Sequence, residues 1–163
     1  GAFTALTTIG GTPDLARIAE HCAKTPEFAC QLWTPGSAAI PAPESFAHDA
    51  RVKAAVIAAP GYGFTFVPNG LSNVTVPVQI WSGAADVNVP TASNAVPVQA
   101  ALGSRAELRV VPGAGHFSFL VPCGLIGPPL LCRDAEGFDR KAFHRSFNEE
   151  MIRFFRAKLD GRG

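Results

Sequence analysis

The sequence predicts an α/β fold in which helices flank a parallel sheet. Three short, mostly apolar runs contain β-branched residues and end near a proline or glycine, which is typical of buried strands; they are residues 52–59, 76–81 and 108–111. Between the second and third runs lies a helical segment, residues 91–102, which Pro97 interrupts. The alternation of strand, helix and strand favours a parallel sheet, because parallel neighbours need a crossover connection.

Two helices are expected before the first strand. Residues 2–9 have apolar side chains three positions apart and end at a glycine pair, which predicts a short helix with one apolar face. A second helix is expected to begin at the N-cap Thr12, with Pro13 at its first position. Residues 35–43 are rich in proline and alanine, which predicts a long surface loop or lid.

The pattern predicts a C-terminal helix more clearly than any other element. Asp139 is expected to cap it, and Phe138 and Phe143 are spaced as a hydrophobic staple. Apolar residues at helical spacing form the stripe expected to be buried, namely Phe143, Phe147, Met151, Phe154 and Phe155. The charged residues off this stripe are expected to form a solvated face, namely Arg140, Lys141, Arg145, Glu149, Glu150, Arg153 and Arg156.

Composition and charge exclude several classes of protein. A chain of 163 residues that is 47% hydrophobic has the length and the core-forming composition of one domain. A net charge of +1 without a basic cluster argues against nucleic-acid binding by a charged surface. No apolar run is long enough to cross a bilayer, and the first residues lack the layout of a signal peptide. We therefore expect a soluble, folded protein.

Four cysteines form two local pairs, Cys22 with Cys30 and Cys123 with Cys132. Neither pair has the short spacing of a zinc knuckle, so no metal site is expected. Pairing within each local pair is the simplest of the three connectivities, and two such disulfides would suit a periplasmic or secreted protein. The alternative is four reduced cysteines that pack as small apolar side chains in a cytosolic protein.

The candidate catalytic residues follow the second and third strands. Asp86 lies in a turn of small residues, and His116 lies in a glycine-rich loop. Because catalytic groups collect beyond the carboxyl ends of parallel strands, we expect the two side chains to lie within about 2.6–3.2 Å of each other. The carboxylate would then orient the imidazole as a base for a nucleophile, although each residue alone is more often a turn or loop former. The other histidines are expected to be structural or surface residues, namely His21, His48 and His144.

Three aromatic residues are candidates for a substrate pocket. Tyr62 and Phe64 follow the first strand and should lie at the same edge of the sheet as Asp86 and His116, and Phe117 is next to the histidine. Each could wall a pocket for an acyl or alcohol group, or pack its loop onto the core.

Two motifs surround the candidate catalytic pair. G-x-x-D-x-x-x-P runs from Gly83 through Asp86 to Pro90, and G-x-G-H-F occupies residues 113–117. Together they look like the acid and histidine segments of the α/β-hydrolase superfamily, and the resemblance implies that Asp86 is the triad acid and His116 the general base. It covers nearly the whole chain, and three segments are similar to bacterial predicted dienelactone hydrolases, namely residues 49–54, 116–123 and 137–155.

The first residues add to the resemblance. Residues 1–6, G-A-F-T-A-L, are similar to the start of the helix after the nucleophile elbow G-x-S-x-G, with Gly1 as its final glycine. The resemblance thus implies that residues 1–163 are a partial domain, the C-terminal half of an α/β-hydrolase fold. The nucleophile would lie upstream of Gly1, in a second chain or a further part of the same chain. No serine or cysteine here stands in such an elbow, and Ser118 is too close to His116 in sequence to be one.

The resemblance also predicts how the fold is completed. The sheet of an α/β-hydrolase has more strands than the three found here. The first helix would ordinarily pack on the absent strands, so much of its apolar stripe is expected to face water. Residues 1–163 are therefore expected to fold natively only against the missing N-terminal half.

Two functions follow as alternatives. The first is a serine-dependent carboxylic ester hydrolase, an esterase similar to dienelactone hydrolases, which acts on a small-molecule ester and needs no metal or organic cofactor. A cysteine nucleophile stays open, because enzymes named for dienelactone cleavage often use one. The second is a non-catalytic α/β-hydrolase-like binding or structural subunit whose elbow serine was lost.

Overall fold

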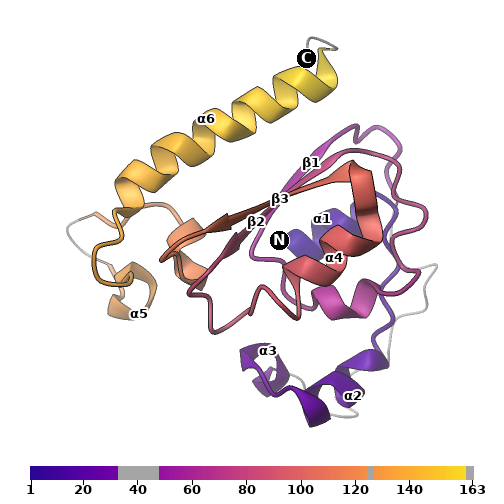
Figure 1. The fold of residues 1–163 in the computed structure, drawn as a ribbon, viewed down its shortest axis with the longest axis horizontal. Coiled ribbons are helices and arrows are strands. Elements are labelled where there is room, and N and C mark those ends of the chain that lie inside the picture. The colour runs from indigo at the N-terminus through magenta and orange to yellow at the C-terminus, as the bar shows by residue number, and fades with distance from the viewer. Residues whose placement is uncertain (33–47, 125–126, 161–163) are drawn as a thin grey trace.

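A computed structural model describes residues 1–32, 48–124 and 127–160 and has a mixed α/β fold (Figure 1). Residues 35–43, expected to form a loop or lid, lie outside these ranges. The α-helices and strands are, in chain order, α1 (Ala2–Thr8), α2 (Arg17–Lys24), α3 (Phe28–Gln31), β1 (Ala55–Ala58), β2 (Val78–Gly83), α4 (Ala95–Leu102), β3 (Ala106–Val111), α5 (Pro129–Cys132) and α6 (Arg140–Leu159). The short 3₁₀ helices are η2 (Gly63–Phe66), η3 (Gly103–Arg105) and η4 (His116–Phe119).

The sheet has three parallel strands in the order β1-β2-β3. The central strand β2 is buried along its whole length, which explains its continuous apolar sequence. In the register, Ile80 of β2 lies between Ile57 of β1 and Leu108 of β3. The prediction of a parallel sheet with flanking helices is therefore confirmed, although β1 begins at Ala55 rather than at residue 52.

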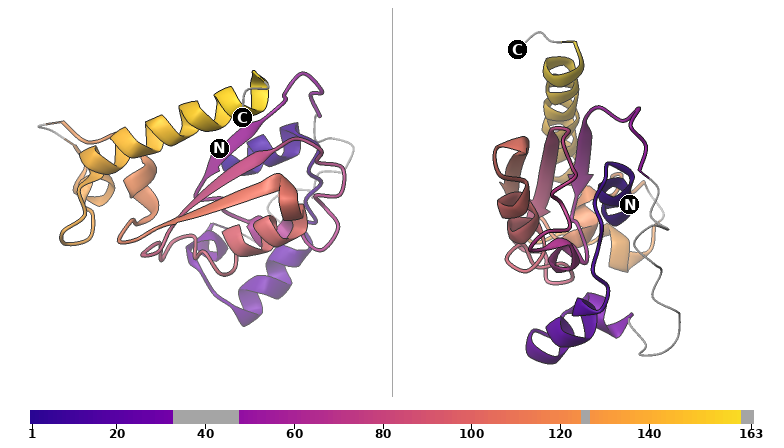
Figure 2. Two further views of the ribbon diagram at one scale, coloured as in Figure 1. Left: turned by 45° about the horizontal axis from the view of Figure 1, so that its top comes forward. Right: turned by 90° about the vertical axis from the view of Figure 1, so that its right-hand side faces the viewer.

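The larger apolar core lies on the face of the sheet covered by α1 and α4 (Figure 2). Leu6 and Ile9 are buried there against β1, and Phe3 packs on Phe66 of η2 with ring centroids 5.3 Å apart. The expectation that the apolar stripe of the first helix faces water is therefore wrong. The apolar side chains of α1 are covered by β1 and by Phe66 of η2.

Helix α6 covers the opposite face of the sheet (Figures 1 and 2). The Asp139 carboxylate accepts a hydrogen bond of 2.9 Å from the Ala142 N–H, as expected of an N-cap. Phe143 and Phe147 pack against Trp81 of β2. The predicted cap is confirmed. Of the predicted stripe, Phe143, Phe147 and Phe154 are buried, whereas Met151 and Phe155 are half-buried. The assignment of Arg140 to the solvated face is wrong. Arg140 is buried, because its guanidinium pairs with Asp134.

Two helices also differ from the prediction. Helix α2 begins at Arg17 rather than at Thr12, because the backbone N–H groups of Thr12 and Asp14 donate to the distant carbonyls of Gly70 and Thr65. These two bonds hold the segment outside the helix. Pro97 does not interrupt α4. It lies in the first turn, where a residue needs no backbone N–H.

Both disulfides form as predicted, and the alternative of four reduced cysteines is wrong. Cys22–Cys30 joins α2 to α3, and Cys123–Cys132 joins the segment after η4 to α5.

Within the described ranges, none of the helices combines the length and the apolar character needed to cross a bilayer.

Candidate active site

The turn after β2 holds Asp86 in one orientation. One carboxylate oxygen, Oδ1, accepts hydrogen bonds from the backbone N–H groups of Asn88 and Val89, at 2.9 and 2.8 Å. The residue is buried, so these donors compensate for the lost hydration of the carboxylate. The other oxygen, Oδ2, is left to face the neighbouring loop.

His116 begins the short helix η4 in that neighbouring loop, after a turn at Gly113 with a φ of 72°. Its Nδ1 lies 2.9 Å from Oδ2 of Asp86, within the expected range. Because a carboxylate oxygen only accepts, Nδ1 carries the proton and the lone pair of a neutral imidazole lies on Nε2. The His116 side chain is 29% exposed and lines an open cavity.

Neighbouring strands bring the two loops together. A Cβ added at Gly83 would lie 2.2 Å from the carbonyl oxygen of Ala114, so only glycine allows this approach. The N–H of Ala84 donates to the carbonyl of Val111, and that of Ala85 donates to the carbonyl of Ala114. The parallel pairing of β2 and β3 thus continues into the loops and fixes the spacing of Asp86 and His116.

A cavity of about 490 Å³ opens beside His116. Its walls come from separate parts of the chain, among them Gly1 and Phe3 at the start of α1, Phe28 of α3 and Phe119 of η4. The backbone at its rim is strained, since Ala59 and Tyr62, which both line it, have φ values of 45° and 58°. Such positive φ values outside glycine concentrate at functional sites.

The expected pocket residues separate in the structure. Tyr62 lines the cavity, and its hydroxyl donates to the carbonyl of Ala29 at 2.8 Å. Burial, followed by the charge of nearby Glu27, raises the pKa of this phenol. Phe64 and Phe117 are not among the residues that line this cavity, and the second of the two interpretations, packing of the loop, describes Phe64. Phe64 is buried against His21, because the two rings stack at 3.6 Å, and the Phe117 ring packs beside that of His116.

A network of polar side chains supports η4 from behind. The buried Ser118 hydroxyl donates to Asp134 Oδ1 at 2.7 Å and accepts from the N–H of Gly115. Arg140 holds the same carboxylate through two hydrogen bonds and donates to the carbonyl of Leu131. Burial raises the pKa of Asp134, but the hydrogen bonds from Arg140 and Ser118 outweigh it and leave the pKa below its ordinary value. The Ser118 hydroxyl is therefore engaged away from His116.

The remaining histidines make contacts outside the cavity. His21 pairs with the buried carboxylate of Glu27, and His144 Nε2 lies 2.9 Å from the backbone carbonyl of Ser118. His48 is exposed near Gly10. Across the described ranges, no three His, Cys, Asp or Glu side chains are grouped so that they could hold a metal ion.

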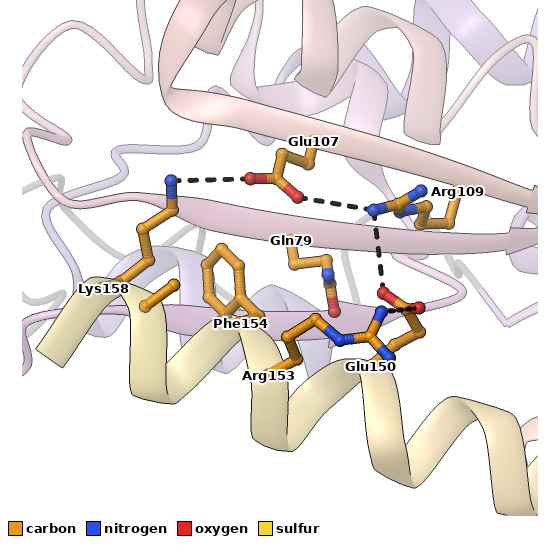
Figure 3. A pocket seen from close by; sticks show the side chains of 8 residues that line it. Gln79, Glu107, Arg109, Glu150, Arg153, Phe154 and Lys158 are labelled. Atoms are coloured by element: carbon orange, nitrogen blue, oxygen red, sulfur yellow. Dashed lines mark hydrogen bonds and ion pairs between the residues drawn. The ribbon is translucent and has the colours of Figure 1, made fainter. Parts of the chain in front are cut away.

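A second hollow, of about 180 Å³, lies between the sheet and α6 (Figure 3). Its charged side chains pair mainly with one another. Glu107 lies 3.5 Å from Lys158, Arg109 lies between Glu107 and Glu150, and Arg153 contacts Glu150. These ion pairs connect β3 with α6. Because they are exposed, they contribute little free energy to the contact.

No protein-family model matches the chain, and no curated protein matches it. An assignment of function therefore rests on the geometry of the site and on the motifs that surround it.

Proposed function

We propose that the chain supplies the acid and the base of a serine-dependent carboxylic ester hydrolase of the α/β-hydrolase type, similar to bacterial predicted dienelactone hydrolases. The observation that carries this proposal is the pair of Asp86 and His116. A buried carboxylate with one oxygen held by two backbone N–H groups presents the other to His116 Nδ1 at 2.9 Å. The imidazole faces a cavity large enough for a small ester.

The chemistry follows from this orientation. His116 Nε2 takes the proton of the nucleophilic hydroxyl, which attacks the carbonyl carbon of the ester, and Asp86 stabilises the imidazolium that forms. His116 then protonates the departing alcohol, which leaves an acyl-enzyme. A water molecule gives its proton to His116 and attacks the acyl carbon. The carboxylic acid departs, and the hydroxyl regains its proton.

The start of α1 supports an upstream nucleophile. Gly1 and Ala2 line the same cavity as His116. In an elbow G-x-S-x-G that ends at Gly1, the nucleophile stands two residues before it and so next to this cavity. Among the described residues that line the cavity, none is a serine or a cysteine. We therefore assign the nucleophile, serine or cysteine, to a segment upstream of Gly1, and the two disulfides favour a periplasmic or secreted location.

The test uses the extended chain, by which we mean residues 1–163 together with the preceding segment that carries the nucleophile. His116→Ala should lower kcat/KM on p-nitrophenyl acetate by at least about 10³-fold, because the nucleophile loses its proton acceptor. His48→Ala, at an exposed histidine, is the matched control and should change it little. Turnover retained by folded His116→Ala would contradict the proposal. No turnover by the unsubstituted extended chain would favour the non-catalytic subunit.

A further inference from the structure

We infer that the cavity beside His116 accepts esters with an uncharged aliphatic acyl chain and discriminates against acyl chains that end in a carboxylate. The inference rests on the proposed function for its catalytic readout. It concerns the chemical class of the substrate, which the pair of Asp86 and His116 does not determine.

The walls of the cavity are apolar. Besides His116 and Tyr62, the side chains that line it are aliphatic or aromatic, and no lysine or arginine is among the described residues that do so. The Tyr62 hydroxyl donates to the carbonyl of Ala29. A substrate carboxylate enclosed here would lose its hydration without gaining a lysine or arginine partner, which disfavours its binding.

Two buried carboxylates lie close to the cavity wall. Asp86 stands behind His116, and Glu27, next to Phe28, is bound to His21 and accepts a hydrogen bond from Asn94 at 2.8 Å. The charge of Glu27 contributes, after burial, to the raised pKa of the Tyr62 phenol, and Tyr62 lines the cavity. The same negative charge would repel a second negative charge in the cavity.

The mouth of the cavity exposes large apolar side chains. Phe28, Leu32 and Leu120 line the cavity and are still 41%, 66% and 45% exposed. They come from two segments that lie far apart in sequence, and they line the same cavity as His116. Such a surface gains free energy when an aliphatic chain covers it.

The catalytic test compares two esters of equal chain length on the extended chain, p-nitrophenyl hexanoate and mono-p-nitrophenyl adipate. We expect kcat/KM for the neutral ester to exceed that for the anionic ester by at least about 100-fold. Leu120→Lys places a cation at the cavity and should reduce this ratio by about tenfold or more. Val121→Lys adds the same charge at an exposed neighbour that does not line the cavity, and should leave the ratio within about twofold.

A binding test separates this inference from the proposed function. 2-Octanone and 7-oxooctanoate have the same number of carbons and differ in one terminal carboxylate, and the NMR shifts of the His116 ring report their binding without turnover. Binding of the neutral ketone at least about tenfold more tightly supports the inference, even in a protein that hydrolyses no ester. Equal or tighter binding of the anion, or equal kcat/KM for the two esters with hydrolysis still dependent on His116, overturns the inference and leaves the proposed function standing.

Discussion

At the scale of single residues, the Asp86 carboxylate connects backbone geometry to imidazole chemistry. Its two oxygens face different partners: Oδ1 accepts from two backbone N–H groups, and Oδ2 contacts His116 Nδ1. Rotation of the carboxylate would break the backbone hydrogen bonds, so the acceptor that faces the histidine is held in place. The orientation of His116 therefore depends on the turn after β2 as much as on its own loop.

Asp86→Asn tests this dependence. The amide oxygen can still accept from Asn88 and Val89, so the amide nitrogen faces His116 Nδ1 and donates to it. The imidazole must then carry its proton on Nε2, where it cannot accept one from the nucleophile. We expect kcat/KM of the extended chain on p-nitrophenyl acetate to fall by about 10³–10⁴-fold without loss of fold, as measured by steady-state kinetics and circular dichroism. Activity within tenfold of the unsubstituted protein would contradict this role.

Asp134→Asn tests the ion pair of the half-buried Asp134 with the buried Arg140. The folded-state pKa of Asp134 is lowered, so its contribution to stability is present above the ordinary aspartate pKa of about 3.9 and is lost as pH falls through the folded-state pKa. We expect the substitution to cost about 2–3 kcal/mol in unfolding free energy at pH 7. Urea denaturation at pH 7 and pH 3 should show a smaller difference between variant and parent at pH 3. Equal differences at both pH values would exclude the assigned ionic role.

At the scale of elements, the sequence predicts those helices and strands whose position depends on local sequence patterns. The strands, the N-cap Asp139 and the stripe of α6 follow from side-chain period and capping chemistry. The start of α2 does not, because hydrogen bonds from Thr12 and Asp14 to distant carbonyls override a favourable capping sequence. The burial of Arg140 depends in the same way on Asp134, a partner that helical periodicity does not reveal.

The contact of α6 with the sheet gives a prediction about stability. Phe147 is buried against Trp81, whereas Ile152 on the same helix is 51% exposed. Phe147→Ala should lower the unfolding free energy by about 3–4 kcal/mol, because it leaves a cavity beside the indole. Ile152→Ala should change it by less than about 0.5 kcal/mol. Urea denaturation measures both, and equal losses would show that α6 is not anchored through its aromatic stripe.

The two disulfides should affect catalysis differently. Cys22–Cys30 fixes α3, which carries the cavity wall Phe28, whereas Cys123–Cys132 encloses Leu131, whose carbonyl accepts from Arg140 of the network behind η4. Replacing the first pair by serine should mainly raise KM, and replacing the second should mainly lower kcat. Each replacement should cost about 2–3 kcal/mol in stability. Thiol counting on the denatured, unreduced parent should find no free thiol, and the same kinetic effect from both replacements would contradict the assignment.

At the scale of the whole molecule, the cavity gathers the start of α1, the end of β1, the turn after β2 and the start of η4 at one edge of the sheet. The proximity of Asp86 and His116 could be predicted because each follows a recognisable strand. The walls Phe3, Phe28 and Leu32 could not, because they come from helical and loop segments without a strand-end signal. Their approach depends on how distant parts of the chain pack, which no local pattern encodes.

The last prediction concerns the origin of the nucleophile. A fluorophosphonate reacts with a serine that a neighbouring base activates: the serine oxygen bonds to phosphorus and fluoride departs. In the extended chain we expect one adduct, located by mass spectrometry two residues before Gly1, and none in the extended chain with His116→Ala. Iodoacetamide would alkylate that position instead if it is a cysteine. Residues 1–163 alone should be neither labelled nor active, since the Ser118 hydroxyl is bound to Asp134. An adduct on Ser118, or ester hydrolysis by residues 1–163 alone, would place the nucleophile within this chain and overturn the assignment.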